Sequence, residues 1–600
     1  MTARPADLRA LLDTVTTIPS NFSPDGSKVL VQSNRSGLAQ LYVVHRESGE
    51  MRRLTDFADP VAGAYLPLGD TVVLASSAGG NERSQLYVIR DDGTGLRPLV
   101  RDPEVIHRLG GASRDGALLA FSSNARHPAD FDVHVLTLDT EESRTVFEMG
   151  GICHGRGFSA DGRWLAVSRR TNLGGDNQLY LVDVDTGDAL EVAAHEGAGY
   201  VGAPAWLSDG SSFYFATDLG RDFAGVARFD LDAGTWAYVM ERGCDLSCVM
   251  NWPATRLLVI ADEAGATRAE LYEPSTLRSM AEVPLPGLGS AEFGFSRDGR
   301  FLAYSFTSAI EPGDVWCFDC DSGESTRLTT SNHDAAAAMV TPTMEPIASF
   351  DGESIPTYVY RPGPSGALDE DPVPVVVYLH GGPEAQHTPT FDPIVQYLVA
   401  AGFAVVAPNV RGSTGYGKRF EHLDDGRKRL DAVADLAAVH DWIAASGDLD
   451  ARRAALLGGS YGGYLVLAGL AFQPERWAAG VDIVGISSLV TFLENTAEWR
   501  RKVREAEYGS LTDDREFLEE ASPLSRADRI RAPLLLIHGA NDPRVPVAEA
   551  EQIHATVSAN GVRSELLVYA DEGHGLSRRA NRLDAYPKVL AFLDDVLHVS

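Results

Sequence analysis

The pattern of apolar and polar positions changes once along the chain, near its middle. In the first half, short apolar runs such as residues 164–167 alternate with polar turns, a pattern typical of antiparallel strands. Beyond Thr341, buried-strand patterns alternate with longer helical stretches, including residues 431–445 and 548–560. This rhythm predicts βαβ units around a mostly parallel sheet.

The first half also carries an internal repeat, in which a turn centred on Asp-Gly precedes an apolar strand. With weaker copies near Leu66 and Asn251, seven units recur about every 45 residues, the period of a four-stranded propeller blade. We predict an all-β seven-bladed propeller; a propeller with fewer blades is the alternative. The five clear copies of the turn are residues 22–26, 112–116, 158–162, 206–210 and 295–299.

Three parts of the chain follow from these patterns. Residues 18–340 form the predicted propeller, and residues 341–600 form the predicted doubly wound α/β domain. Residues 1–17 contain a helical pattern ahead of the first blade, which we expect to pack on the α/β domain. A chain of 600 residues is too long for one core, so more than one domain is expected.

The most informative motif is Gly-x-Ser-x-Gly, at residues 458–462, between an apolar strand and an apolar helix. This is the pattern of the nucleophile elbow of α/β-hydrolases. Glycine at Gly458 and Gly462 removes side chains that would clash in so tight a turn. A chain with 58 glycines can match this pattern by chance, so the partners of Ser460 decide its meaning.

A nucleophilic serine needs a base and a carboxylate that orients the base. Asp542 follows the strand pattern at residues 533–539, and His574 follows the last one, at residues 564–569. Ser460, Asp542 and His574 thus each end a strand, in the chain order of α/β-hydrolases. Asp571 is the alternative carboxylate, although it lies on the histidine's own loop.

Two backbone amides are expected to form an oxyanion hole. One is the amide of Tyr461, directly after the serine. The other comes from Gly381 or Gly382, which follow the strand pattern at residues 373–379. A plain Gly-Gly-Pro turn is the alternative interpretation of that segment.

With a propeller ahead of this hydrolase pattern, nearly the whole chain resembles the prolyl oligopeptidase (S9) family of serine peptidases. Its motifs at residues 380–383, 409–417 and 542–546 are most similar to the acylaminoacyl-peptidase and aminopeptidase branch. The resemblance implies catalysis by the same serine, aspartate and histidine. It implies short peptides as substrates, because a propeller over the active site excludes bulky chains. It also implies that Arg544 binds a substrate carbonyl near the cut, with a structural salt bridge as the alternative.

The resemblance leaves open how the substrate's N-terminus is recognised. A peptidase that acts on free amines needs carboxylates near the substrate's ammonium group. Glu82 and Asp176 lie in corresponding loops of the second and fourth predicted blades, and either could be such an anchor. A loop acid that is simply solvated is the alternative for each. An enzyme for N-acylated peptides would need an apolar pocket instead.

Composition narrows the partners. The net charge of −32 argues against nucleic-acid binding, because phosphates would be repelled. The N-terminus lacks the pattern of a leader peptide, and no apolar run is long enough for a bilayer, so we expect a cytoplasmic protein without a membrane partner. Five cysteines without metal-site spacing are expected to be free thiols, and we expect neither metal nor organic cofactor. A homo-oligomer is compatible with the sequence.

The sequence therefore predicts a serine peptidase that releases free or N-acylated amino acids, or short fragments, from the N-termini of short peptides through an acyl-enzyme. A carboxylesterase with the same triad is one alternative, although esterases of this fold carry small caps rather than a propeller. A non-catalytic interaction protein built on the propeller is the other, although the complete set of serine, aspartate and histidine argues against it.

Overall fold

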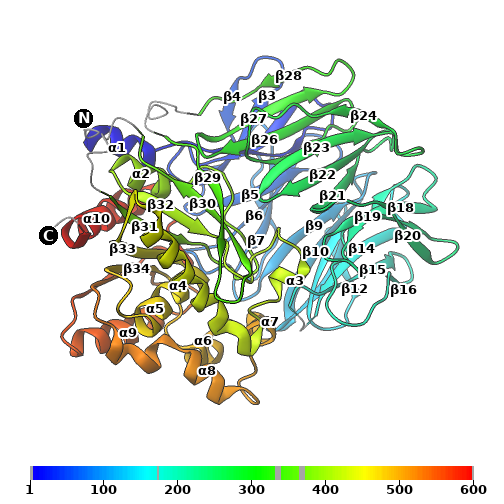
Figure 1. Cartoon of the computed structure of the whole chain (residues 1–600). Helices are drawn as coiled ribbons and strands as arrows, with labels where there is room; N and C mark the ends of the chain where they lie inside the picture. Colours follow the sequence, from blue (N-terminus) through cyan, green and yellow to red (C-terminus); the bar gives the residue numbers. More distant parts are fainter. Residues whose placement is uncertain (1–4, 172–173, 332–338, 364–371, 598–600) are drawn as a thin grey trace.

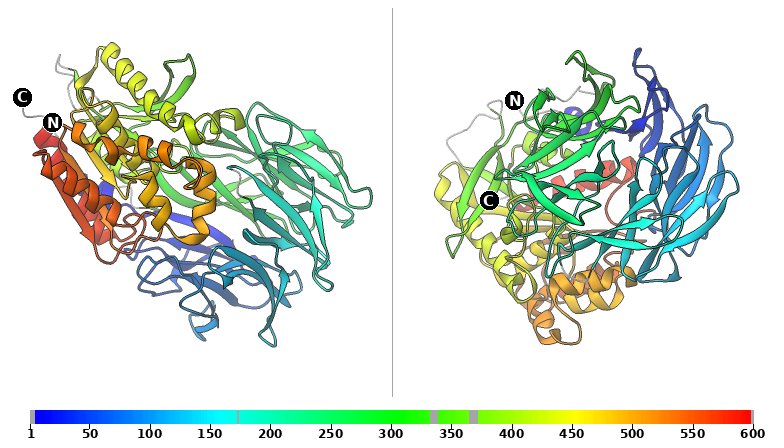
Figure 2. Two further views of the ribbon diagram at one scale, coloured as in Figure 1. Left: turned by 90° about the horizontal axis from the view of Figure 1, so that it is seen from below. Right: turned by 90° about the vertical axis from the view of Figure 1, so that its right-hand side faces the viewer.

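The structure, a computed structural model, describes residues 5–171, 174–331, 339–363 and 372–597. It contains a propeller of antiparallel sheets beside an α/β domain, and both chain ends lie on the side of the α/β domain (Figure 1). Two further views show the same division (Figure 2). The predicted fold class is confirmed. Of the segments that bear on the predicted boundaries, residues 1–4 and 332–338 lie outside the described part.

In the described residues, the propeller consists of seven groups of four consecutive strands, each an antiparallel meander. The third and fourth groups join into one sheet, because Phe131 of β11 pairs with Ile152 of β13. The strands are β1(Thr17–Phe22), β2(Lys28–Ser33), β3(Gln40–His45), β4(Met51–Arg53); β5(Val61–Tyr65), β6(Thr71–Ser76), β7(Gln85–Arg90), β8(Arg97–Val100); β9(His107–Ala112), β10(Leu118–His127), β11(Asp130–Thr137), β12(Glu142–Phe147); β13(Ile152–Phe158), β14(Trp164–Arg170), β15(Asn177–Asp183), β16(Ala189–Val192); β17(Ala205–Trp206), β18(Ser212–Thr217), β19(Gly225–Asp230), β20(Thr235–Met240); β21(Asp245–Met250), β22(Leu257–Glu263), β23(Ala266–Tyr272), β24(Ser279–Glu282); β25(Ser290–Phe295), β26(Phe301–Ser308), β27(Glu311–Asp319) and β28(Ser325–Arg327).

The sequence repeat corresponds to the turn between the first and second strands of a blade. In the first blade, the Ser23 hydroxyl donates to Asp25 at 2.6 Å, and the Ser23 amide donates to the carbonyl of Lys28. The same serine–aspartate bond recurs at 2.5–2.6 Å in the third, fourth and seventh blades. The weaker copies keep the same backbone bond, from the Leu66 amide to the Thr71 carbonyl and from the Asn251 amide to the Arg256 carbonyl. In the copy at Asn251, the side-chain oxygen also accepts from the backbone amides of Thr255 and Arg256. The repeat is thus a hydrogen-bonded turn that starts the second strand.

The first and last blades pack against each other and close the ring. Strand β1 contacts β25, β26 and β27. Apolar side chains of both blades share one core cluster, with Val29 and Val31 on one side and Ala303 and Val315 on the other. Each blade is built from consecutive strands, so the ring closes through side-chain packing rather than through an exchanged strand.

Within residues 339–363 and 372–597, the α/β domain contains one eight-stranded sheet in the order β29-β30-β32-β31-β33-β34-β35-β36. The strands from β32 onward in this order run parallel, whereas β29 and β30 are antiparallel to their neighbours. The strands are β29(Thr343–Ala348), β30(Ser354–Tyr360), β31(Val373–Leu379), β32(Ala404–Pro408), β33(Leu449–Gly459), β34(Ala479–Ile483), β35(Leu534–Gly539) and β36(Ser564–Tyr569).

Helices cover both faces of this sheet, and the two faces bury separate apolar clusters. Helix α5, which follows β33, is buried on nearly every side, which explains its continuous apolar sequence. The helices are α1(Pro5–Leu12), α2(Pro393–Ala400), α3(Lys418–Glu421), α4(Arg429–Ser446), α5(Tyr461–Phe472), α6(Leu489–Asn495), α7(Glu498–Tyr508), α8(Arg515–Ala521), α9(Ala548–Ala559) and α10(Arg579–Leu597), with 3-10 helices η2(Gly426–Lys428) and η3(Pro523–Arg529).

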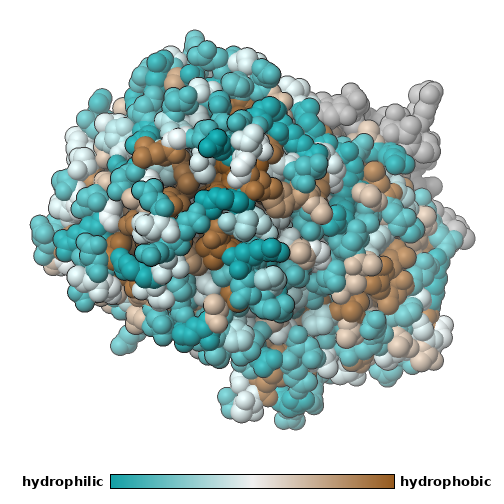
Figure 3. Space-filling view, turned by 180° about the vertical axis from the view of Figure 1, so that it is seen from behind, coloured by the Kyte–Doolittle hydropathy of each residue, from teal (hydrophilic) through white to brown (hydrophobic). Residues whose placement is uncertain are grey.

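The N-terminal helix α1 lies against α2 and α10 of the α/β domain. Its Leu12 is buried in the cluster that also contains Leu398 and Phe592 of those two helices. The described part of the chain contains no helix that is both long and apolar enough to cross a bilayer. Seen from behind, most of the surface is hydrophilic, with separate hydrophobic areas (Figure 3).

Candidate active site

Ser460 occupies the sharp turn between β33 and α5, at the carboxyl edge of the sheet. Its backbone has φ +57°, a left-handed conformation that is costly for a residue with a side chain. A Cβ on Gly458 would lie 2.5 Å from the Gly462 carbonyl oxygen, and one on Gly462 would lie 2.1 Å from that of Leu379. Both glycines are therefore required by close backbone packing, as expected for an elbow.

Three side chains from three different loops form a continuous hydrogen-bonded chain. His574 Nε2 lies 2.9 Å from the Ser460 hydroxyl, and His574 Nδ1 lies 2.7 Å from Asp542 Oδ2. Because a carboxylate only accepts, Nδ1 carries the proton and Nε2 is left as the acceptor for the serine. The arrangement leaves His574 able to remove a proton from Ser460.

The loop after β35 holds Asp542 in place. Its Oδ1 accepts from the backbone amides of Arg544, at 2.8 Å, and Val545, at 3.0 Å. The neighbouring His538 is buried and bonds the Val545 carbonyl at 2.9 Å, consistent with a structural role. Asp571, the alternative carboxylate, instead lies near Arg578 and Asn581. The aspartate that touches His574 is thus Asp542.

The loop after β31 passes beside the serine. A Cβ on Gly381 would lie 3.5 Å from the Cβ of Ser460. The Gly382 carbonyl accepts from Arg504 of α7 at 3.2 Å, which ties this loop to α7. Tyr461 starts α5, so its amide belongs to the first turn, where amides lack partners within the helix. The amide of Tyr461 and the backbone of Gly381 are thus close to the serine.

Glu82 and Arg544 contact each other across the interface between the domains. Arg544 Nε donates to Glu82 Oε1 at 2.6 Å, and both side chains remain partly exposed. Glu82 adopts φ +58°. The Glu82 loop also touches the histidine loop, because a Cβ on Gly80 would lie only 2.4 Å from the Gly573 amide nitrogen. Two residues that the sequence singled out separately therefore form one pair near the serine, histidine and aspartate.

Asp176, the second candidate anchor, has its carboxylate engaged inside the propeller. Its Oδ1 lies 3.0 Å from both His195 Nε2 and the Gly199 amide, and its Oδ2 accepts from Thr171 at 2.5 Å. The residue lines the cavity but is buried. These contacts favour a structural role and leave Glu82 as the better-placed anchor.

A cavity of 790 Å³ lies between the propeller and the α/β domain. Arg108 and Asp176 are among its propeller residues, and Glu384, Thr414 and Glu421 line it from the other domain. Glu384 follows the Gly381–Gly382 loop by two residues, but neither the chain from Ser460 to Asp542 nor the Glu82–Arg544 pair belongs to the described lining of this cavity. A peptide of a few residues fits such a volume.

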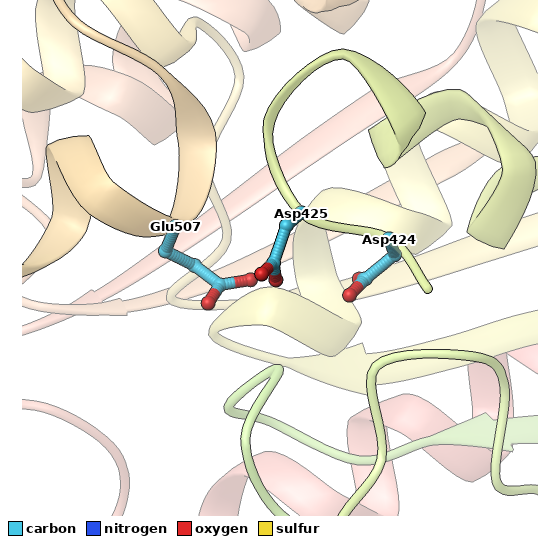
Figure 4. A group of neighbouring side chains, drawn as sticks. All are labelled: Asp424, Asp425 and Glu507. Atoms are coloured by element: carbon cyan, nitrogen blue, oxygen red, sulfur yellow. The ribbon is translucent and has the colours of Figure 1, made fainter. Parts of the chain in front are cut away.

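Three carboxylates gather behind the elbow, from Asp424, Asp425 and Glu507 (Figure 4). Their oxygens lie within 4.8 Å of one another, a spacing that could suit a cation. However, the fully buried Arg429 forms ion pairs with Asp424 and Glu507, and it also bonds the Tyr461 hydroxyl at 3.0 Å. The Arg429 guanidinium thus already offsets the negative charge of this cluster. Its bond to Tyr461 holds the residue after the serine in position.

Asp482, at the end of β34, gives a prediction about pH. Burial raises its pKa to about 8, and its Oδ1 has no hydrogen-bond partner among the described residues. Between about pH 4 and pH 8, the folded protein holds a proton that the unfolded chain releases, so unfolding free energy falls as pH rises. Asp482→Asn should therefore show a smaller drop in Tm from pH 5 to pH 8 than wild type. Exposed Asp528→Asn is the control; an equal drop in Tm for Asp482→Asn and wild type would contradict the assignment.

Sequence reasoning missed Arg429, Arg504, Arg108 and Arg500. Arg429 sits in the polar run 426–429, and Arg500 and Arg504 sit in the charged helix α7, so nothing in the local pattern predicted burial. Arg108 lies on β9, where it faces the cavity. The contact between the domains brings Arg108 beside Trp499 and Arg500, whereas the other three arginines all belong to the α/β domain.

A propeller ahead of an α/β-hydrolase with serine, histidine and aspartate in contact defines a class of serine hydrolases. The profile of the prolyl oligopeptidase family matches residues 389–600, and that of the prolyl oligopeptidase N-terminal β-propeller domain matches residues 69–331. The chain belongs to the prolyl oligopeptidase (S9) family. It is accordingly a serine-type peptidase that hydrolyses peptides.

Two relatives match almost the whole chain. Dipeptidyl aminopeptidase BIII of Pseudoxanthomonas mexicana is 28% identical, over 93% of this chain and 84% of that protein. The uncharacterized peptidase YuxL of Bacillus subtilis (strain 168) is 26% identical, over 93% of this chain and 86% of its own. Mouse acylamino-acid-releasing enzyme is 29% identical over 38% of this chain and 32% of its own length.

Solved structures share the fold. A prolyl endopeptidase structure superposes with a TM-score of 0.87 and 21% identity, covering 99% of this chain and 91% of the other. A puromycin hydrolase gives a TM-score of 0.86, also at 21% identity, with 100% and 97% coverage. At such identities the likeness concerns the fold alone.

Proposed function

We propose that Ser460 is the nucleophile, His574 the general base and Asp542 the carboxylate that orients the base. The observation that carries this proposal is the continuous hydrogen-bonded chain from Ser460 through His574 to Asp542. Ser460 attacks the scissile carbonyl while His574 takes its proton and then passes it to the leaving amine. Water, activated by His574, next hydrolyses the acyl-enzyme.

The negative oxygen of each tetrahedral intermediate is stabilised by the amide of Tyr461 and by an amide of Gly381 or Gly382. Such donors act most strongly on the charge that develops in the transition state. The proximity of Gly381 to Ser460 supports this role. Arg504, through its bond to the Gly382 carbonyl, holds the loop in position.

The enzyme recognises a free N-terminus, with Glu82 binding the substrate's ammonium group and Arg544 binding the carbonyl oxygen of the same residue. The ammonium nitrogen and the carbonyl oxygen of one residue are only a few covalent bonds apart. Glu82 and Arg544, which contact each other, can therefore bind both. The next carbonyl along the peptide is then the one presented to Ser460. The product of this arrangement is a dipeptide.

Two further observations support the free-amine reading. Glu82 holds a left-handed backbone that costs about 1–2 kcal/mol, and such strain concentrates at functional sites. The relative that matches most of the chain at 28% identity is called a dipeptidyl aminopeptidase, which agrees with the proposed product.

The pair can be tested by comparing a free peptide with its N-acetylated form. Glu82→Gln should lower kcat/KM for the free peptide by about tenfold to a hundredfold, because a charge-assisted hydrogen bond is lost. It should affect the acetylated peptide much less. Arg544→Ala should lower kcat/KM for peptides to a similar degree, and Arg544→Lys should recover only part, because an ammonium lacks the guanidinium fork.

The neighbouring Arg83→Ala is the matched control, since Arg83 pairs with exposed Glu104 at 2.6 Å. It should leave both substrates unaffected. Equal losses on the free peptide, its acetylated form and a small acyl ester would remove the binding role of Glu82 and Arg544. A parallel fall in Tm would point to a structural salt bridge.

A further inference from the structure

Two arginines beside the Glu82–Arg544 pair have no acidic partner within hydrogen-bonding distance among the described residues. Arg108 comes from β9 of the propeller, and Arg500 comes from α7 of the hydrolase. Both guanidinium carbons lie close to the centre of the Trp499 ring, at 4.7 Å and 5.2 Å. Nε of Arg500 is buried and has no hydrogen-bond partner in the described part of the chain. Positive charge from both domains therefore converges on one aromatic side chain.

The surrounding charges do not neutralise these two groups. Arg544 is paired with Glu82, and Arg504 is paired with Glu384 at 3.2 Å. Burial lowers the pKa of Arg500 to about 10, and the nearby positive charges of Arg504 and Arg544 add to the effect. The group remains charged at neutral pH, and no carboxylate among the described residues bonds it, so the Trp499 ring offsets only part of its loss of hydration. A bound anion would supply a compensating partner.

We propose that Arg108 and Arg500 form a subsite that binds a carboxylate of the substrate. This inference rests on the proposed function: if Glu82 and Arg544 bind the amine and carbonyl of the N-terminal residue, its side chain projects from the same Cα. Arg108 and Arg500 both lie within electrostatic range of that pair. An N-terminal Asp or Glu is therefore the favoured source of the carboxylate.

The local charge also opposes the charge of the whole molecule. The net charge of −32 repels an acidic peptide at long range. In partly desolvated surroundings, a guanidinium without an acidic partner attracts a carboxylate more strongly than it would at the surface. The subsite thus allows this negatively charged protein to select a substrate that carries a carboxylate. The other source of the same chemistry is the α-carboxylate of a very short peptide.

The first experiment compares coumarin amides of Asp-Ala and Asn-Ala, which have nearly the same shape and differ in charge. The wild-type enzyme should have a kcat/KM about tenfold to a hundredfold higher for Asp-Ala. Arg108→Gln and Arg500→Gln should each reduce that ratio by about tenfold, and Arg108→Lys should recover part of it. Arg156→Gln, which removes the same charge from the same cavity, should keep the wild-type ratio.

The second experiment distinguishes the source of the carboxylate. The peptide Asn-Ala-Ala is compared with its C-terminal amide, which lacks the α-carboxylate. A preference for the free acid that Arg108→Gln and Arg500→Gln abolish would support the subsite and assign it to the α-carboxylate. The inference would be overturned if the wild-type enzyme cleaved both members of each substrate pair at equal rates, or if its preferences persisted in both arginine variants. In either case dipeptide release would continue, and the proposed function would stand. Absence of any dipeptide product from the wild type would overturn the proposed function as well.

Discussion

Ser460→Ala should lower kcat by at least about 10⁴-fold on any peptide that the wild-type enzyme cleaves. The hydroxyl is the proposed nucleophile, and no other hydroxyl contacts His574 in the described part of the chain. The fold should survive, because removing one oxygen at the edge of the sheet changes little packing. Steady-state kinetics on purified protein measures the loss, and thermal unfolding checks the fold.

His574→Ala should give a loss of comparable size, because a serine without its base is a weak nucleophile. The double variant should be little worse than either single variant, since the triad acts as a unit. Turnover near the wild-type rate in clean Ser460→Ala protein would reject the assignment. The assignment would also be rejected if the losses of kcat from Ser460→Ala and His574→Ala were independent and additive.

Arg429→Met should lower the free energy of unfolding by about 3–5 kcal/mol, because it leaves two buried carboxylates without their cation. Arg429 is fully buried and ion-paired with Asp424 and Glu507, both also buried. Burial raises the pKa of Asp424, so the cluster is poorly solvated. Urea denaturation at pH 8 measures the effect.

Arg427→Met is the control, because Arg427 is mostly exposed and pairs with Asp514 at 3.1 Å. A surface pair of this kind contributes no more than about 1 kcal/mol. Combining Arg429→Met with Asp424→Asn and Glu507→Gln should recover most of the lost stability, since no buried charge remains. A small effect of Arg429→Met alone would mean that water reaches the cluster.

The fold was predictable because its signals are local. In four of the seven blades, the turn that starts the second strand uses serine, aspartate and glycine at the same positions, so it recurs in the sequence as it does in the structure. The change to βαβ rhythm after Thr341 likewise reflects helices packed on a parallel sheet. The predicted domain limits stay predictions, although β28 ends at Arg327 and β29 begins at Thr343.

The site was predictable only where strand ends determine it. Ser460, Asp542 and His574 each follow a strand, so their meeting at one edge could be inferred from their order. The contact between Glu82 and Arg544 joins residues 462 positions apart, and no local sequence pattern predicts it. The burial of Arg429 was equally hidden, because a run of arginines and lysines normally indicates a solvated surface.

Mass spectrometry of the products from one peptide, offered with a free and with an acetylated N-terminus, tests whether the enzyme releases dipeptides from free N-termini. Recognition of the free amine by Glu82 and of the adjacent carbonyl by Arg544 predicts that the free peptide loses its first two residues as a dipeptide. The acetylated peptide should stay largely intact. Release of an acetylated amino acid, or cleavage of both forms at equal rates, would contradict the account.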